Sequence, residues 1–525
     1  MTAGIRPQRR SSLEWILLLV YLLMVLVGVA FHEPWRDEWR AWMISASATG
    51  PAQLHDLLRN EGHPWLWYLL LKPFIHWPGG QAGLALAGLS TGLLGSLLIF
   101  FCFRLPLWIR AGVLFSVFWL VEYVVISRSY GLAFAFTSLA ILAGLRARRW
   151  LLAALLIGLA AHTHLLVALA NLPLIALLAL HCPALPGRRR LLALVLALVL
   201  SLTGIAAAIG PGALAYGQYR LSNMASRVAR LLPGRGAAVV APSVAPSIPT
   251  PRATATAGSD QGSSDQGSSD QDRQAMLVLP RLPMPQAGIV LILVVLAGLW
   301  RRCRTVVLVY SLPALTLLLL FLRFIYRGGA WHQGTVFMVL VYTLVLAAED
   351  PGGGRPALAA GWLDRPWLDG LRRSGWGGRL AMLALSLLLL VGAAEGVHQW
   401  RQDLLQPFSG APAAAAAINA SGYSPKDILV RSSAMEEVLA IALQPGAPRP
   451  GPVGGHLRPF QQDIWALPDW QICRRAAGRV RRTGRPVLIL ANGRQGGPTV
   501  CPGLRTRTLR FDGLRESLEL VEIQP

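Results

Sequence analysis

Residues 15–46 read WILLLVYLLMVLVGVAFHEPWRDEWRAWMISA. The first half is apolar from Trp15 to Phe31, which is enough to cross most of the roughly 30 Å hydrocarbon core of a bilayer. The second half then places two adjacent carboxylates, Asp37 and Glu38, among tryptophans and arginines. A plain membrane helix does not tolerate that mixture. The junction therefore predicts a membrane protein with a charged site at the bilayer surface.

The rest of the chain repeats the apolar half of this pattern. Hydrophobic residues make up 54% of the 525 residues, charged residues only 14%, and the mean hydropathy is +0.48. A soluble protein of this length could not cover so much apolar side chain with polar surface. We therefore expect an all-α polytopic membrane protein with about eleven transmembrane helices. The expected spans are 13–31, 82–103, 107–126, 130–145, 150–164, 165–181, 190–210, 286–300, 304–322, 334–349 and 378–397.

The net charge of +23 is supplied almost entirely by arginine, with lysine only at Lys72 and Lys426. The arginines cluster between apolar segments, as the positive-inside rule expects of cytoplasmic loops, and no RNA- or DNA-binding motif accompanies them. We therefore interpret the positive charge as marking cytoplasmic loops and expect no nucleic-acid partner. If residues 65–77 do not cross the membrane, every such cluster faces the cytoplasm together with the N-terminus. The clusters are 146–149, 187–190, 301–304 and 372–379.

Two domains follow from this topology. Residues 1–397 form the membrane domain, whose first extracytoplasmic loop is 32–81. A long extracytoplasmic loop, 211–285, carries Pro, Ser, Gly and Asp repeats that predict disorder. Residues 398–525 form a small extracytoplasmic soluble α/β domain, with KDILVRS and RPVLILANG as strands and SAMEEVLAIAL as a helix.

Two of the five cysteines, Cys473 and Cys501, lie in this C-terminal domain. An extracytoplasmic domain folds in an oxidising space, where disulfides form and persist. Spacing alone does not fix the pairing. We nevertheless predict a disulfide between these two residues.

Three motifs stand at the predicted outer ends of helices: RDEWRAWMIS (36–45), EGHPWLWYLLL (61–71) and SRSYGLAF (127–134). With the many spans and the soluble C-terminal portion, they resemble the GT-C superfamily of glycosyltransferases, and within it the protein O-mannosyltransferase and aminoarabinose transferase branch. The resemblance implies transfer of a sugar from a polyprenyl-phosphate carrier to an acceptor on the outer face. It also implies a catalytic aspartate in the first loop, which maps onto Asp37.

The chemistry makes matching demands on the first loop. A hydroxyl that attacks an anomeric carbon needs a carboxylate to take its proton, and a departing phosphate needs cations. Asp37 is the candidate general base and Glu38 the second candidate catalytic residue, although neighbours on a helix point about 100° apart. Glu38 therefore fits better as a residue that orients the loop or pairs with Arg36 or Arg40. The structural alternative is a pair of salt-bridged interfacial acids, with Arg36, Trp39 and Arg40 covering the lipid headgroups.

Three further candidates for substrate binding come from the other two motifs. His63 precedes Pro64, which favours an extended conformation at the mouth of the next helix. It would bind the donor phosphate or the acceptor, or else cap the helix. Arg128 offers a guanidinium fork that accepts two phosphate oxygens, or it rests at the headgroups. Tyr130 stands beside it at the same outer turn.

The last candidates are His164, Arg327 and His332. The family layout implies that His164 lines the cavity, while the His-x-His pair it forms with His162 has no evident third ligand and predicts no metal site. Arg327, the glycine pair after it and His332 would cradle a phosphate, because glycine lets backbone approach a ligand. A tight turn between two helices is the structural alternative.

These residues together predict a glycosyltransferase of the bacterial inner membrane. Its partners would be a polyprenyl-phosphate sugar donor, a lipid, glycan or protein acceptor, and membrane lipids. No redox cofactor is implied, and the need for a divalent metal is left open. The alternative is a transporter or flippase of lipid-linked saccharides, which should show paired broken helices that the sequence lacks. A non-enzymatic assembly protein is a third option.

Overall fold

The computed structural model describes most of the helical core and parts of the C-terminal region. The described residues are 11–58, 61, 63–78, 80–180, 187–209, 285–300, 303–325, 330–349, 375–423, 428–430, 469–492, 501, 504–514 and 517–524. Most of the long loop 211–285, the expected helix SAMEEVLAIAL and Arg327 lie outside these ranges.

The predicted helical membrane architecture is confirmed. Among the described residues, seven stretches are long and apolar enough to cross a membrane, a bent pair forms a further candidate, and three shorter apolar helices occupy the remaining predicted spans. The long stretches are α1 (Ser12–Phe31), α5 with η1 (Gly80–Leu97, Leu98–Cys102), α7 with η3 (Ser129–Ile141, Leu142–Arg146), α10 (Gly187–Ala208), η4, α14 and η5 (Val306–Ser311, Leu312–Leu320, Phe321–Ile325), α15 (Ala330–Glu349) and α17 (Trp376–Leu405). The bent pair is α6 (Leu107–Leu114) with η2 (Phe118–Val125), which meet at 50°, and the shorter helices are α8 (Trp150–Ala161), α9 (Leu165–Leu180) and α13 (Pro285–Trp300).

Burial separates the outer helices of this bundle from the inner ones. On α1, Leu19 and Leu23 are more than half exposed, while Tyr21 and Val25 are fully buried. Exposed leucine is stable on a face that meets lipid, because no water is present there to penalise it. By contrast, α15 is buried along most of its length and forms the centre of the core.

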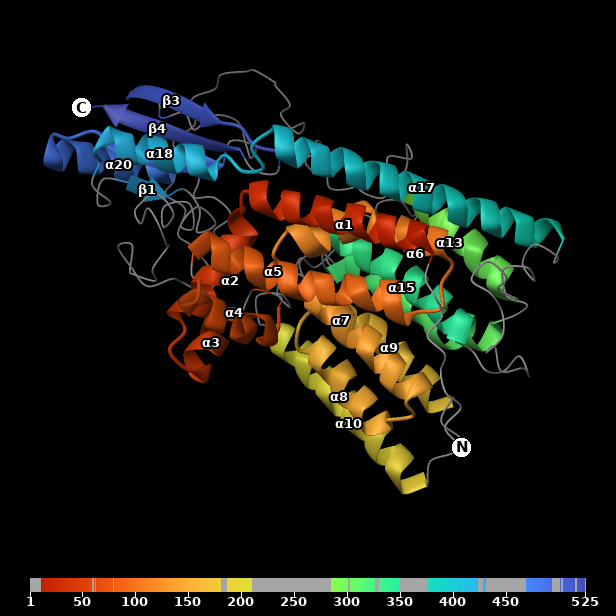
Figure 1. Cartoon of the computed structure of the whole chain (residues 1–525). Coiled ribbons are helices and arrows are strands. Elements are labelled where there is room, and N and C mark those ends of the chain that lie inside the picture. The colour runs from red at the N-terminus through yellow and green to blue at the C-terminus, as the bar shows by residue number, and fades with distance from the viewer. Residues whose placement is uncertain are drawn as a thin grey trace, which may run out of the picture.

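Three short helices lie between α1 and α5 at one end of the bundle (Figure 1): α2 (Arg36–Ser47), α3 (Pro51–Leu58) and α4 (Leu66–His76). At 1.5 Å per residue, the eleven residues of α4 span only about 16 Å. Its buried side chains, Trp67, Tyr68 and Leu71, pack with α2 and α5. The helix α4 is not among the described helices long and apolar enough to cross a membrane. This fits the expectation that residues 65–77 do not cross, which stays a prediction.

Lys72, one of the two lysines of the chain, stands on α4. Its Nζ donates to the carbonyl oxygens of Ser45 (3.2 Å) and Ala48 (2.5 Å) at the end of α2. The last carbonyls of a helix lack intrahelical partners and carry partial negative charge, so a lysine there satisfies both deficits. Lys72 thus fixes the end of the helix whose beginning carries Asp37.

Two of the arginine clusters predicted to be cytoplasmic, 146–149 and 187–190, lie within the described residues. Arg146, at the end of η3, pairs with Glu349 at the end of α15. Arg188, Arg189 and Arg190 open α10, which begins at the end of the bundle away from the short helices (Figure 1). The charge asymmetry behind the predicted topology is therefore present in space, and a cytoplasmic N-terminus stays a prediction.

The helix α17 carries the chain out of the bundle beside the short helices (Figure 1). Its 30 residues span about 45 Å, which exceeds a hydrocarbon core of about 30 Å. Beyond it lie α18 (Ala411–Ser421), α20 (Asp469–Thr483) and a sheet in the order β1-β2-β4-β3. The strands are β1 (Ile428–Val430), parallel to β2 (Val487–Asn492), and β4 (Leu518–Gln524), antiparallel to both β2 and β3 (Arg505–Phe511).

Both faces of this sheet are covered by a helix. Leu488 and Leu490 of β2 pack under α18, while Val487 and Ile489 pack under α20. Successive strand residues point to opposite faces, which explains why β2 is apolar without alternation. The strands expected in KDILVRS and RPVLILANG are confirmed.

The predicted disulfide is also confirmed. Cys473 on α20 is bonded to Cys501, with the two Cα atoms 5.3 Å apart. Both cysteines are buried against the sheet. The bond therefore joins α20 to the segment that leads into β3.

Candidate active site

The candidate site begins at the first turn of α2. Trp35 precedes the helix, and its backbone N–H donates to Glu38 Oε2 at 3.1 Å, which satisfies one of the unpaired amides of the helix start. Asp37 lies in the same turn, where the positive end of the helix dipole favours a carboxylate. The order Arg-Asp-Glu thus suits a helix beginning, and it leaves the two acids on different sides.

Asp37 is held between two arginines. Its Oδ1 accepts from Arg36 Nε at 3.2 Å, and its Oδ2 accepts from Arg128 Nη2 at 3.0 Å. Burial alone would raise the pKa of Asp37, but the charges of Arg36 and Arg128 outweigh it and lower that pKa below its ordinary value. A quarter of the side chain remains exposed. Asp37 is therefore an ionised, reachable carboxylate.

Arg128 reaches Asp37 from the turn between η2 and α7. Its guanidinium carbon lies 5.7 Å from the ring centroid of Trp35 and 5.8 Å from that of Tyr130, while the side chain is 9% exposed. Aromatic rings at these distances attract a guanidinium. The turn itself is packed against α5, because a Cβ on Gly88 would lie 2.7 Å from the Ser127 Cα. Arg128 is therefore fixed in place.

Glu38, in contrast, is fully enclosed. Its Oε1 accepts from the Ser127 backbone N–H at 2.7 Å, and its Oε2 lies 2.9 Å from His32 Nε2. The sequence suggested Arg36 or Arg40 as its partner. In the structure those arginines contact Asp37 and Glu61 respectively, the latter at 2.6 Å.

The expected lipid-facing side of α2 is also corrected. Trp39 is 5% exposed and Arg40 is 6% exposed, so neither covers the headgroups. Trp39 packs with the short helices, and Arg40 holds the segment that contains Glu61. Helical spacing correctly predicts that Trp39 and Arg40 share one face of α2. That face is covered by α3 and α4 and does not meet the headgroups.

A cluster of histidine and tyrosine rings adjoins the two charges. The ring centroid of His164 lies 4.9 Å from that of His63, 4.0 Å from that of Tyr130 and 6.4 Å from that of His332. His63 comes from the segment before α4, His164 from the turn before α9 and His332 from the first turn of α15. Every predicted site residue that the structure describes is therefore brought to one place, while Arg327 lies outside the described residues.

The protonation of this cluster follows from its contacts. His164 Nδ1 accepts from the Leu166 backbone N–H at 3.2 Å, so its hydrogen sits on Nε2, which is buried without a hydrogen-bond partner. Burial, and after it the charge of Arg128, lower the pKa of His63 to about 4 against the opposing charge of Asp37. The Nδ1 atom of His63 also has no hydrogen-bond partner. Neutral imidazoles with unused hydrogen-bonding atoms thus stand beside a paired anion and cation.

Within the described ranges, no group of three or more His, Cys, Asp or Glu side chains is placed to hold a metal ion. The ring nitrogens of the cluster are hydrogen-bonding groups for a polar ligand. Phosphate and sugar hydroxyls are ligands of that kind.

Two residues of the site escaped the sequence analysis. His32 ends α1 and contacts Glu38, and its Nδ1 lies 3.0 Å from Oδ2 of Asp403 on α17. His32 carried a signal, since it is the first polar residue after an apolar run. Asp403 carried none, because 371 residues separate it from its partner.

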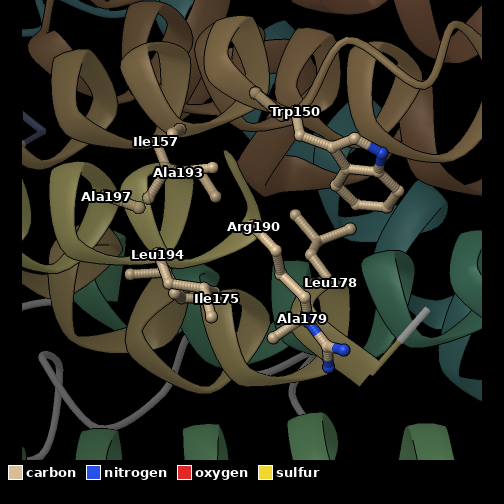
Figure 2. Close-up of a pocket in the computed structure, with 11 residues that line it drawn as sticks. Trp150, Ile157, Ile175, Leu178, Ala179, Arg190, Ala193, Leu194 and Ala197 are labelled. Atoms are coloured by element: carbon tan, nitrogen blue, oxygen red, sulfur yellow. The ribbon is translucent and has the colours of Figure 1, made fainter. Parts of the chain in front are cut away.

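A separate crevice lies away from this cluster, between α8, α9 and α10 near the start of α8. Its walls are almost wholly alkyl, with the Trp150 ring and the Arg190 side chain beside them (Figure 2). It has no acid or histidine in its lining and offers no group for bond-making chemistry. The candidate site is therefore the cluster of charged and histidine side chains around Asp37, and not this apolar crevice.

No protein-family model matches the sequence. No curated protein matches it either. Among solved structures, the chain is similar to the crystal structure of ArnT from Cupriavidus metallidurans bound to undecaprenyl phosphate, with 13% identity and a TM-score of 0.45 over 97% of this chain and 98% of that one. A TM-score below 0.5 carries no weight for function, which rests here on the residues.

Proposed function

We propose that this chain is a GT-C-like membrane glycosyltransferase that moves a sugar from a polyprenyl-phosphate donor to an acceptor hydroxyl on the extracytoplasmic face. The observation that carries the proposal is Asp37, a partly exposed carboxylate held by Arg36 and Arg128 at the membrane-edge end of the helix bundle. A purely structural ion pair has no reason to keep an accessible carboxylate beside two ring nitrogens, His63 Nδ1 and His164 Nε2, that are buried without a hydrogen-bond partner.

The proposed reaction assigns one task to each group. Asp37 takes the proton of the acceptor hydroxyl as its oxygen bonds to the anomeric carbon. The bond from that carbon to the phosphate oxygen breaks, and the lipid phosphate leaves with the electron pair. Arg128 stabilises the departing charge with its guanidinium fork.

The two arginines also explain how a carboxylate with a lowered pKa would serve as a base. Arg128 donates to Asp37 at 3.0 Å in the described structure. A donor phosphate that draws on the same guanidinium weakens its hold on Asp37, and the proton affinity of Asp37 then rises. Donor binding thus prepares the base for the acceptor.

The aromatic and histidine side chains would bind the donor. Tyr130 flanks Arg128, and His63, His164 and His332 present ring nitrogens to the same place. Phosphate and sugar hydroxyls would satisfy such atoms. Lipid access is supplied by the apolar outer faces of the helices, and the described arginine clusters at the opposite end favour an extracytoplasmic site.

The test is a transfer assay with purified, reconstituted protein. Wild type and Asp37→Asn would be incubated with polyprenyl-phosphate-linked sugars and crude membrane acceptors, and Asp512→Asn serves as the matched control because its side chain is 68% exposed on the C-terminal sheet. We expect Asp37→Asn to lose transfer by about 10²- to 10⁴-fold while Asp512→Asn stays at the wild-type rate. Equal transfer by both variants would remove Asp37 from catalysis. Translocation of a lipid-linked saccharide by wild type with no bond formed would support the transporter instead.

A further inference from the structure

His32 occupies a buried position between two carboxylates at the end of α1. Its Nε2 lies 2.9 Å from Glu38 Oε2 and its Nδ1 lies 3.0 Å from Asp403 Oδ2. None of the three side chains is more than 4% exposed. Both ring nitrogens face carboxylate oxygens, so both act as donors, and the ring is an imidazolium.

The first carboxylate connects this imidazolium to the proposed base and its arginine. Glu38 also accepts from the backbone N–H groups of Trp35 and Ser127, at 3.1 and 2.7 Å. Trp35 immediately precedes the helix that carries Asp37, and Ser127 immediately precedes Arg128. One carboxylate therefore fixes both segments that meet in the Asp37–Arg128 contact.

The second carboxylate connects it to the C-terminal part of the chain. Asp403 stands near the end of α17, one turn after Trp400, whose Nε1 donates to the Met24 carbonyl of α1 at 2.8 Å. Phe408 follows α17, and its ring lies edge-on to His32 with centroids 4.6 Å apart. The helix α17 is thus in direct contact with the His32 ring that also binds Glu38.

We propose that His32 is a positioning residue: through its two carboxylates it couples the docking of α17 to the geometry of Asp37 and Arg128. This inference rests on the proposed function. Loss of the cation would leave Glu38 and Asp403 as two buried like charges facing an uncharged group, and one of them would withdraw or take a proton. Either change loosens the amides of Trp35 and Ser127.

The experiment compares His32→Gln and Asp403→Asn with Glu14→Gln. Glu14 is the matched control because it forms an equally buried ion pair with Arg110 near the opposite end of the same helix α1. Two readouts would be taken on full-length reconstituted protein: amide hydrogen exchange around residue 127, and the separate kcat and KM for the donor. A merely structural role would move neither readout in folded molecules.

The expected result is specific to the His32 end of α1. Exchange at Ser127 should rise, and kcat should fall by about 10- to 100-fold with KM for the donor little changed, in His32→Gln and Asp403→Asn. Glu14→Gln should show neither change per folded molecule. If His32→Gln does not fold, Asp403→Asn carries the same test.

Two outcomes would overturn the inference. One is wild-type exchange at Ser127 in Asp403→Asn, and the other is a kcat loss no larger than that of Glu14→Gln. Absence of sugar transfer by wild type would instead refute the proposed function, and the exchange comparison would still decide whether His32 positions the turn.

Discussion

Both ends of α1 bury charge, and they do so differently. At the N-terminal end, Glu14 accepts from Arg110 of α6, which also donates to the Phe100 carbonyl at 2.7 Å, and both side chains are 1% exposed. At the C-terminal end, His32 and Glu38 are equally enclosed, but the next contact, between Asp37 and Arg128, has a carboxylate that is 25% exposed. The charges at the N-terminal end of α1 are fully buried, whereas the charges at its C-terminal end adjoin a partly exposed carboxylate.

This difference separates charge that serves packing from charge that is available for chemistry. A buried pair costs several kcal/mol of desolvation per ion, and its partners return that only when the geometry is good. The Glu14–Arg110 pair joins α1 to α6. At the other end, the enclosed charges hold an accessible carboxylate in place, which is an arrangement typical of functional sites.

The largest effect on transfer after Asp37 itself is expected at Arg128. Arg128→Gln removes the cation that neutralises the leaving phosphate, so kcat/KM should fall by about 10²- to 10³-fold. The measurement is the transfer assay with saturating and limiting donor. Arg510→Gln is the control, since Arg510 is an exposed arginine on β3 that pairs with the exposed Asp512. Equal rates for the two variants would mean that Arg128, like Arg110, serves packing and not catalysis.

The second effect is on pH dependence at the C-terminal end of α1. Burial lowers the pKa of His32, but Glu38 and Asp403 outweigh it and raise that pKa to about 10. Because the folded pKa lies above the ordinary value of 6.5, the stabilisation is complete below pH 6.5 and is lost as the pH rises toward 10. The groups facing the ring are Glu38 of α2 and Asp403 of α17.

Thermal unfolding of wild type and His32→Gln across that pH range measures this dependence. The advantage of wild type should be greatest near pH 6 and should shrink toward pH 10. A constant difference between the two proteins would mean that the ring is not charged. The Glu14→Gln variant supplies the reference, because the Glu14–Arg110 pair contains no histidine.

The third effect falls on stability alone. Glu14→Gln leaves Arg110 as a buried cation without its acid, so the free energy of unfolding should fall by about 3–5 kcal/mol. Transfer per folded molecule should stay within about two-fold of wild type, since the change is remote from the site. Unfolding in detergent and the transfer assay measure the two quantities. A specific activity that falls as far as in Arg128→Gln would abolish the distinction between the two ends.

Much of the helical architecture could be predicted from hydropathy, because a membrane span needs only a long apolar run with no internal partner. The run from Trp15 to Phe31 and the apolar helix α15 were both predicted on that ground. The distribution of arginine along the chain predicts that residues 65–77 do not cross, and the short helix α4 fits that prediction. These properties are local or additive, so a single sequence displays them.

The candidate site was only partly predictable. Asp37, His63 and Arg128 were singled out, because polar residues at the ends of apolar runs are conspicuous. The partners were not foreseen, since Arg40 with Glu61 and His32 with Asp403 are contacts between distant segments. Helical spacing says which residues share a face, but only the packing of α3 and α4 shows what covers that face.

The smallest effect on transfer is expected at the disulfide. Cys473 and Cys501 are 28 residues apart, and replacing both with serine should lower the free energy of unfolding of the C-terminal region by about 3–4 kcal/mol through loop-closure entropy. The pair lies on the face of the sheet covered by α20, while α18, the helix that follows α17, covers the other face. Transfer should therefore stay within about two-fold of wild type while the sheet remains folded. Chemical denaturation and the transfer assay, run at the same temperature, test both statements. If transfer instead falls as in Asp403→Asn, the sheet itself holds α17 in position against His32. The network of contacts at the C-terminal end of α1 would then include the C-terminal domain.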